Sequence, residues 1–180
     1  MERIWINMGL FDKLFNPKPE RMLQPLTGIS DEDIVAPSGG ELVDVKTVSD
    51  AVFAEEMMGK SIAFRYDRDK VILCAPANGK LSVLFPTGHA YGVERNDGVQ
   101  ILVHIGVDTV NSKGDGFRIL DKKQGDSVKA GDPIVEVDIK KLSEKYDMSV
   151  ILILADPKDK EFTFIDPQTV GRGQSLLKND

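Results

Sequence analysis

From residue 34 onward, the sequence is a series of short segments rich in β-branched and aromatic residues, separated by turn-forming residues. The segments are residues 71–74, 80–85, 99–107, 134–139, 150–154 and 162–165. The turns consist of Gly, Asn, Asp, Pro and Ser, at residues 37–40, 78–79, 96–98, 114–116 and 125–126. Regularly spaced short strands with such turns are typical of a β-sandwich or barrel. Helical periodicity is scarce, with one short candidate at residues 140–145, so we predict an all-β fold with little helix.

A weak internal repeat supports this prediction. Residues 34–42 read Ile-Val-Ala-Pro-Ser-Gly-Gly-Glu-Leu, and residues 73–81 read Leu-Cys-Ala-Pro-Ala-Asn-Gly-Lys-Leu. Two copies are too few for a solenoid, which needs at least three stacked units. The repeated strand–turn–strand unit therefore predicts a duplicated β motif within one domain.

The composition is that of a globular protein and argues against several classes of partner. Hydrophobic residues make up 41% of the 180 residues, enough for one domain with a substantial core. The net charge of −6 argues against a nucleic-acid partner, which would need a basic stripe, but suits a basic protein partner. The longest apolar run, residues 150–155, is far shorter than the ~20 residues of a membrane-spanning helix. The single cysteine, Cys74, lies in an apolar run, so we expect a buried thiol and a reducing, cytoplasmic setting.

The N-terminal 30 residues form a separate part of the chain in our prediction. We expect residues 1–30 to be a flexible segment with a short amphipathic helix, which ends before Pro17 and Pro19. This helix is either a frayed tail or an element that binds a membrane surface or a partner, and the sequence leaves both open. Its apolar face would consist of Leu10, Phe11, Leu14 and Phe15.

The chain has two histidines, His89 and His104, and both lie among the predicted strands. Strand alternation around His104 sends Ile101, Val103, Ile105 and Val107 to one face, so the imidazole points to the opposite, outer face. Gly106 removes bulk beside this imidazole, which would leave room for a ligand or a partner's backbone.

The second histidine follows a Pro-Thr-Gly turn. Thr87, two residues before His89, is placed to hydrogen-bond a ring nitrogen and so fix its tautomer. From these residues alone, the two histidines fit a nucleophile with a helper, a general acid–base pair, or part of a metal site.

Several segments resemble the glucose-type IIA component (EIIA) of the phosphoenolpyruvate-dependent sugar phosphotransferase system. These are residues 85–93 (Phe-Pro-Thr-Gly-His-Ala-Tyr-Gly-Val), residues 101–117 with the Val-His-Ile-Gly-Val-Asp-Thr-Val sequence, and residues 125–133. Residues 52–59 and 8–14 resemble the family as well, and the latter match suggests that natural translation starts at Met8. The resemblance implies an antiparallel β-sandwich with a shallow site, formed by a domain of this family at residues 31–180.

The resemblance also implies a function, that of a phosphotransferase component acting as a phosphocarrier. His104 matches the phosphorylated residue, which receives phosphate from the histidine-bearing protein HPr and passes it to the IIB domain of a permease for glucose or a related sugar. His89 matches the helper that supports the phosphoryl group, and Thr87 matches the residue that orients this helper. No cofactor is required. The two imidazoles could bind zinc, but only with a ligand from a partner, because they make up half of a tetrahedral site.

Members of this family dock their partners through a rim of residues around the histidines. The resemblance implies that five residues of this chain form that rim. The apolar ones are Phe53, Phe85 and Leu102, and the acidic ones, which would pair with a partner's arginine, are Asp50 and Asp108. Tyr91 and Leu102 differ from the residues more common in the family, and we expect both to touch the rim.

Three other functions agree less well with the sequence. A zinc-dependent hydrolase would need His-x-x-x-His or carboxylate–histidine spacing, which the sequence lacks. A biotinyl or lipoyl carrier is suggested by residues 125–132, but the sequence has no Met-Lys-Met or Asp-Lys-Ala segment at a hairpin tip. A non-catalytic regulator of transporters or kinases would not need both histidines, and both are present.

Overall fold

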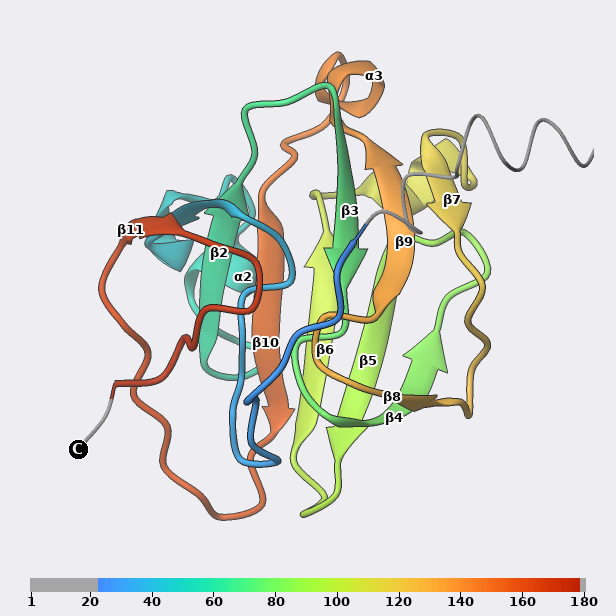
Figure 1. The fold of residues 1–180 in the computed structure, drawn as a ribbon. Helices are drawn as coiled ribbons and strands as arrows, with labels where there is room; N and C mark the ends of the chain where they lie inside the picture. The colour runs from blue at the N-terminus through green and yellow to red at the C-terminus, as the bar shows by residue number, and fades with distance from the viewer. Residues whose placement is uncertain (1–22, 179–180) are drawn as a thin grey trace, which may run out of the picture.

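The computed structural model describes residues 23–178, and these form two packed antiparallel β-sheets (Figure 1). The larger sheet has eight strands in the order β11-β1-β2-β10-β6-β5-β4-β8, and the smaller has three in the order β3-β9-β7. The strands are β1 Gly40–Val43, β2 Ser61–Arg65, β3 Lys70–Cys74, β4 Gly79–Leu84, β5 Ala90–Arg95, β6 Gln100–Ile105, β7 Phe117–Ile119, β8 Ser127–Val128, β9 Pro133–Asp138, β10 Val150–Asp156 and β11 Gln168–Val170. The short helices are η2 Val45–Thr47, α2 Ala51–Ala54, η3 Thr109–Ser112 and α3 Ile139–Ser143.

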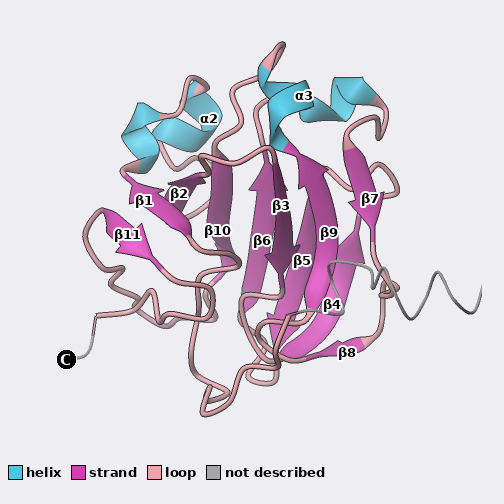
Figure 2. Cartoon of the chain, turned by 45° about the horizontal axis from the view of Figure 1, so that its top comes forward, coloured by secondary structure: helices cyan, strands magenta, loops and turns pink. Residues whose placement is uncertain are grey.

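The main core lies between the two sheets. Figures 1 and 2 show β3 and β9 in front of β5 and β6, with α3 at one end of the sandwich. Alternate residues of these strands point into the space between the layers, so that each sheet contributes one face to a shared apolar cluster. The all-β prediction is confirmed. The cluster includes Val71, Leu73, Val93, Ile101, Val103, Ile105, Val135, Val137, Val150 and Leu152.

A second, smaller core covers the outer face of the large sheet. The η2 and α2 segments pack there on the middle strands β2, β6 and β10. Because this cluster lies on the face opposite to the main core, β6 and β10 are covered on both sides. Its members are Val45, Val48, Phe53, Ala63, Val107, Ile151 and Ile153, with Val43 and Leu102 packed against them.

The internal repeat of the sequence is a structural duplication. The two Ala-Pro segments lie side by side, with Val35 N–H donating to Pro76 O (2.8 Å) and Cys74 N–H donating to Pro37 O (3.0 Å). When the two copies are aligned, Val35 corresponds to Cys74 and Pro37 to Pro76, so the two bonds are equivalent. The two copies therefore pair about a local two-fold axis, which confirms the predicted duplicated motif.

Two strand predictions need correction. Residues 162–165 form no strand; Phe164 makes only an isolated bridge to Leu177 at the edge of the fold. The predicted strand 99–107 ends earlier, at Ile105, because Gly106 adopts a positive φ of 72°. This turn reverses the alternation, so Val107 packs with Phe53 on the outer face and not with Ile105 in the main core.

The predicted N-terminal helix lies in residues 1–22, outside the described residues, as does Met8. Residues 23–30, part of the predicted flexible segment, make side-chain and backbone contacts with the domain. Gln24 O accepts a hydrogen bond from Arg172 (2.5 Å), and Leu26 lies against both Gly131 and Gly173. In the part of the chain that the structure describes, no helix has the length and apolar character needed to cross a bilayer.

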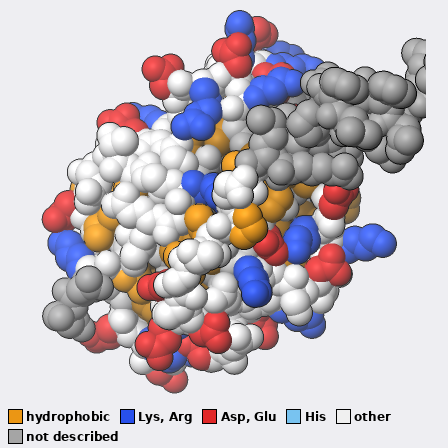
Figure 3. Space-filling view, in the orientation of Figure 1, with side chains coloured by type: hydrophobic (Ala, Val, Ile, Leu, Met, Phe, Trp, Pro, Cys, Tyr) orange, Lys and Arg blue, Asp and Glu red, His pale blue; other side chains and the backbone are white. Residues whose placement is uncertain are grey.

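The remaining surface has mixed charge. Figure 3 shows acidic and basic side chains scattered over one face, with hydrophobic patches between them. Cys74 is free and fully buried, as predicted, and burial raises the pKa of its thiol to about 11. This thiol is therefore protonated at neutral pH.

Candidate functional site

The two histidines lie side by side at the large sheet, His104 on β6 and His89 immediately before the neighbouring strand β5. His104 is the fifth residue of β6, and its flanking residues Val103 and Ile105 are buried in the main core. Alternation therefore turns the imidazole to the outer face, as the sequence predicts. In the register of β5 and β6, Ala90 lies opposite His104, and His89 O accepts a hydrogen bond from Ile105 N–H (2.8 Å). The two imidazoles meet edge to face, with ring centroids 5.5 Å apart.

The tautomer of His104 is fixed by its own turn. Its Nδ1 lies 2.9 Å from the carbonyl oxygen of Gly106. A carbonyl can only accept, so Nδ1 carries the hydrogen and Nε2 carries the free lone pair. This is the arrangement that a nucleophilic imidazole requires.

The turn before β5 positions His89. Gly88 N–H donates to Phe85 O (2.8 Å), which closes a β-turn whose second residue is Pro86, the favoured residue there. A hydrogen bond of 2.5 Å joins Thr87 Oγ1 and His89 Nδ1, which leaves His89 Nε2 without a partner from this turn. The threonine thus lies where the sequence places it, against the ring.

Burial favours the neutral form of both histidines. It lowers the pKa of the His89 imidazole. It is also the largest cause of the lowered pKa of His104, to which the neighbouring His89 contributes, while the Gly106 carbonyl and the carboxylates of Asp108 and Asp50 act in the opposite direction. A neutral ring has the lone pair that attack on phosphorus needs.

This pKa shift makes a testable prediction about pH. Folding favours the neutral rings, so the unfolded chain binds more protons below its own histidine pKa of about 6.5. The stability contributed by His89 and His104 is complete above that pH and declines as the pH falls below it. We expect NMR titration of the ring protons to give midpoints below 6.5 for both residues. A midpoint above 6.5 for either one would contradict the inferred burial effect.

The short helix α2 packs against the His104 ring. Asp50 caps it, because the Asp50 side chain accepts a hydrogen bond from Val52 N–H (2.8 Å). Phe53, on the same helix, is 7% exposed, and its ring centroid lies 4.9 Å from that of His104. Phe53 therefore supports the imidazole from one side and offers little surface of its own.

The remaining rim residues surround the pair. Phe85 is 41% exposed, with its ring centroid 4.9 Å from that of His89. Leu102 is half-buried against the outer cluster, and Asp108 is exposed in the turn after β6, with a positive φ of 58°. The structure thus brings all eight predicted site residues onto elements that border the two histidines.

Five exposed apolar residues on these same elements were missed from the sequence. They lie on or just after α2, on β4 and in η3, next to the predicted rim residues. A signal for one group was present, because two consecutive methionines lie within residues 52–59, which resemble the family. The five are Val52, Met57, Met58, Val83 and Val110.

Two expectations about the surroundings of the histidines are wrong. Tyr91 does not touch the rim: it is fully buried, and its hydroxyl donates to Cys74 O (2.7 Å). The space beside Gly106 is not open to a ligand or partner either. A Cβ there would lie 2.5 Å from Thr109 Cγ2 and 3.1 Å from Asp147 O, so the chain itself fills this space.

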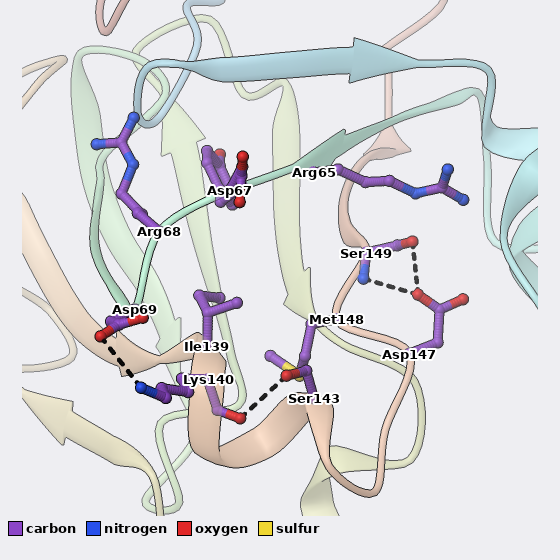
Figure 4. Close-up of a pocket in the computed structure, with 11 residues that line it drawn as sticks. Arg65, Asp67, Arg68, Asp69, Ile139, Lys140, Ser143, Asp147, Met148 and Ser149 are labelled. Atoms are coloured by element: carbon purple, nitrogen blue, oxygen red, sulfur yellow. Dashed lines mark hydrogen bonds and ion pairs between the residues drawn. The ribbon is translucent and has the colours of Figure 1, made fainter.

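A surface pocket of about 450 Å³ lies near the site but contains none of the predicted residues. Arg65, Arg68 and Lys140 line it together with Asp67, Asp69 and Asp147 (Figure 4). In Figure 4, the two arginine side chains diverge from each other, so they do not converge on one anion. Among residues 23–178, no three His, Cys, Asp or Glu side chains gather closely enough to hold a metal ion.

Comparison with known proteins identifies the class to which this fold and site belong. The sequence profile of the phosphoenolpyruvate-dependent sugar phosphotransferase system family EIIA 1 matches residues 32–160. The chain belongs to this family, and it is a phosphocarrier component of sugar transport.

Individual relatives are similar over most of the chain. It is 38% identical over 138 residues to the "PTS system glucose-specific EIIA component" of Haemophilus influenzae, covering 77% of each. It is 37% identical over 145 residues to the "PTS system glucoside-specific EIICBA component" of Staphylococcus carnosus, covering 80% of this chain but 20% of that one. The solved structure of glucose permease IIA from Mycoplasma capricolum superposes with a TM-score of 0.74 at 34% identity, covering 81% of this chain and 93% of the other.

Proposed function

We propose that His104 accepts a phosphoryl group from phospho-HPr on Nε2 and passes it to the IIB domain of a sugar permease. The observation that carries this proposal is the hydrogen bond from His104 Nδ1 to Gly106 O, which leaves Nε2 as the free nucleophile. As the bond from phosphorus to Nε2 forms, the bond from phosphorus to the donor's nitrogen breaks. The Nδ1 hydrogen stays in place, so no proton needs to move.

His89 would act on the phosphoryl oxygens. Its Nδ1 would accept from the Thr87 hydroxyl, so that Nε2–H is a donor facing the space above His104. The phosphoryl group spreads negative charge over its oxygens during transfer, and a preplaced donor stabilises this charge.

Docking of two protein partners in turn requires an open, shared surface. The exposed apolar residues around the histidines, with Asp50 and Asp108 among them, fit a partner that presents an apolar patch and a basic residue. The EIICBA names of relatives such as the glucoside-specific one join C, B and A parts in one component, which supports a IIB domain as the acceptor. Two relatives named as glucose-specific EIIA components favour glucose or a related sugar. We therefore propose that the chain acts in the cytoplasm together with these partners.

The experiment that tests this function uses purified components. The full chain is incubated with phosphoenolpyruvate, Enzyme I and HPr, and acid-labile phosphate is then measured and mapped by mass spectrometry. We expect one phosphoryl group per chain, on His104, which disappears when a matching IIB domain is added. Absence of label, or label on another residue, would overturn the proposal.

The helper role of His89 makes a separate prediction. His89→Gln should still accept phosphate from HPr, because the nucleophile and its Gly106 bond remain, but it should pass phosphate to IIB about 10²-fold more slowly. Rapid-quench measurement of both half-reactions distinguishes the two steps. Onward transfer at the full rate would rule out this role.

A zinc ion shared with a partner is a further prediction for this face. The bond from His104 Nδ1 to Gly106 O leaves the Nε2 lone pair of His104 as one candidate ligand. His89 would bind zinc through Nε2 in its other tautomer, with Nδ1–H donating to Thr87 Oγ1, and a partner carboxylate plus water would complete a tetrahedral site. We expect zinc to tighten binding of a partner that presents a Glu or Asp there, and only with the unphosphorylated chain. Equal tightening of the phosphorylated chain, measured by calorimetry, would exclude His104 as a ligand.

A further inference from the structure

The carboxylate of Asp147 joins two segments that are far apart in the sequence. One oxygen, Oδ2, accepts a hydrogen bond from Ser49 N–H (3.1 Å), just before α2. The other, Oδ1, accepts from Ser149 N–H (2.9 Å) and Ser149 Oγ–H (2.7 Å), just before β10. Figure 4 shows the carboxylate turned back onto Ser149. Three donors thus converge on one half-buried charged group, and such charge-assisted bonds are stronger than neutral ones.

The backbone of the same segment holds the turn after His104. Asp147 O accepts from Val107 N–H (2.8 Å), and Ser149 O accepts from Gly106 N–H (3.0 Å). The first bond is made by the N–H of the very peptide group whose carbonyl, that of Gly106, accepts from His104 Nδ1, and the second by the N–H of the preceding peptide group. The direction of that carbonyl therefore depends on residues 147–149.

The other end of the Asp147 contact leads to a second support of the same imidazole. Ser49 precedes Asp50, the cap of α2, and α2 carries the Phe53 ring that packs against His104. The Asp147 side chain therefore bonds to both supports: the segment that orients the Gly106 carbonyl and the segment that begins α2.

We propose that Asp147 is a positioning residue for phosphoryl transfer. It holds the Gly106 carbonyl and α2 in place together, so that His104 keeps its hydrogen on Nδ1 and presents Nε2 at a fixed point. The role in transfer rests on the function proposed above; the effect on the tautomer of His104 does not. Displacement of a reacting atom by about 1 Å can slow a reaction by about 10²-fold, so loss of this link has a measurable effect.

The test compares Asp147→Asn with Asp69→Asn in the full chain. The asparagine has nearly the same size, but it has one accepting oxygen in place of two, and its N–H₂ group only donates, so it cannot accept from donors on both sides. Asp69 lines the same pocket, and its side chain forms an exposed ion pair with Lys140 (3.6 Å), so Asp69→Asn controls for the loss of a negative charge there. The first readout is the pair of ring ¹⁵N shifts of His104 in the unphosphorylated protein, which report the tautomer. The second readout is kcat and KM, measured separately, for phosphoryl transfer from phospho-HPr.

The expected result is specific to one variant. Asp147→Asn should mix the two tautomers of His104 and lower kcat by 10- to 100-fold with KM for HPr within about twofold. Asp69→Asn should leave both readouts unchanged. Asp147→Glu keeps the charge and should restore most of the tautomer signal.

Other outcomes would overturn the proposal. They are an unchanged tautomer in Asp147→Asn, or a loss of rate that follows the loss of folded protein alone. If Asp147→Asn does not fold, Ser149→Ala replaces it: this variant removes one donor and should give a smaller shift in the same direction, and no shift would count against the proposal. If the wild-type chain takes up no phosphate, the proposed function fails, but the ¹⁵N shifts still decide whether Asp147 fixes the imidazole.

Discussion

His104→Gln is expected to abolish phosphoryl acceptance completely. The glutamine amide is of similar length, but it has no lone pair of comparable basicity to attack phosphorus. Like the neutral imidazole, the glutamine side chain is uncharged, so the substitution leaves the net charge of the outer face unchanged. Labelling from radioactive phosphoenolpyruvate in the presence of Enzyme I and HPr measures the effect.

The fold should survive this change, which makes the loss of label interpretable. The variant gives up the bond from Nδ1 to Gly106 O, at a cost of about 1 kcal/mol. Urea unfolding should therefore show a stable domain. His89→Gln is the matched control, because it alters the neighbouring ring and should still take up label. Retained label on His104→Gln would show that another residue is the acceptor.

Strands could be predicted from the sequence in two situations: where only one face of the strand reaches the main core, and where the apolar run is long. In β6, alternation correctly assigned Ile101, Val103 and Ile105 to the core and His104 to the outer face. The strand β5 was not predicted from the sequence, because Tyr91, Gly92 and Val93 are all buried. A strand buried on both faces shows no alternation, and its pattern does not reveal it.

The site was predicted from motifs around the histidines, and the geometry between distant segments was not. The Pro-Thr-Gly-His sequence is local, so the contact between Thr87 and His89 could be expected from spacing alone. The contact between Ser49 and Asp147 spans 98 residues and depends on how β10 is placed beside β6. Likewise, nothing in the sequence indicates that the space beside Gly106 is filled by Thr109 and Met148.

Gly106→Ala is expected to be the most destabilising small substitution near the site. The positive φ of 72° costs an alanine about 1–2 kcal/mol. Its Cβ would also lie 2.5 Å from Thr109 Cγ2, 2.9 Å from Met148 Sδ and 3.1 Å from Asp147 O. Overpacking of this kind costs about 1–3 kcal/mol more, so we expect the free energy of unfolding to fall by about 2–5 kcal/mol.

Gly125→Ala separates the two causes. Gly125 has a positive φ of 97°, but a Cβ there would meet nothing within 4 Å. This variant should therefore lose only the backbone part, about 1–2 kcal/mol, in the same urea titration. The excess loss in Gly106→Ala measures the packing of the turn against residues 147–148. That packing also fixes the Gly106 carbonyl, so Gly106→Ala should slow phosphoryl acceptance in its folded fraction, while Gly125→Ala should not. Equal losses of stability for both variants would mean that the turn yields to the added methyl group.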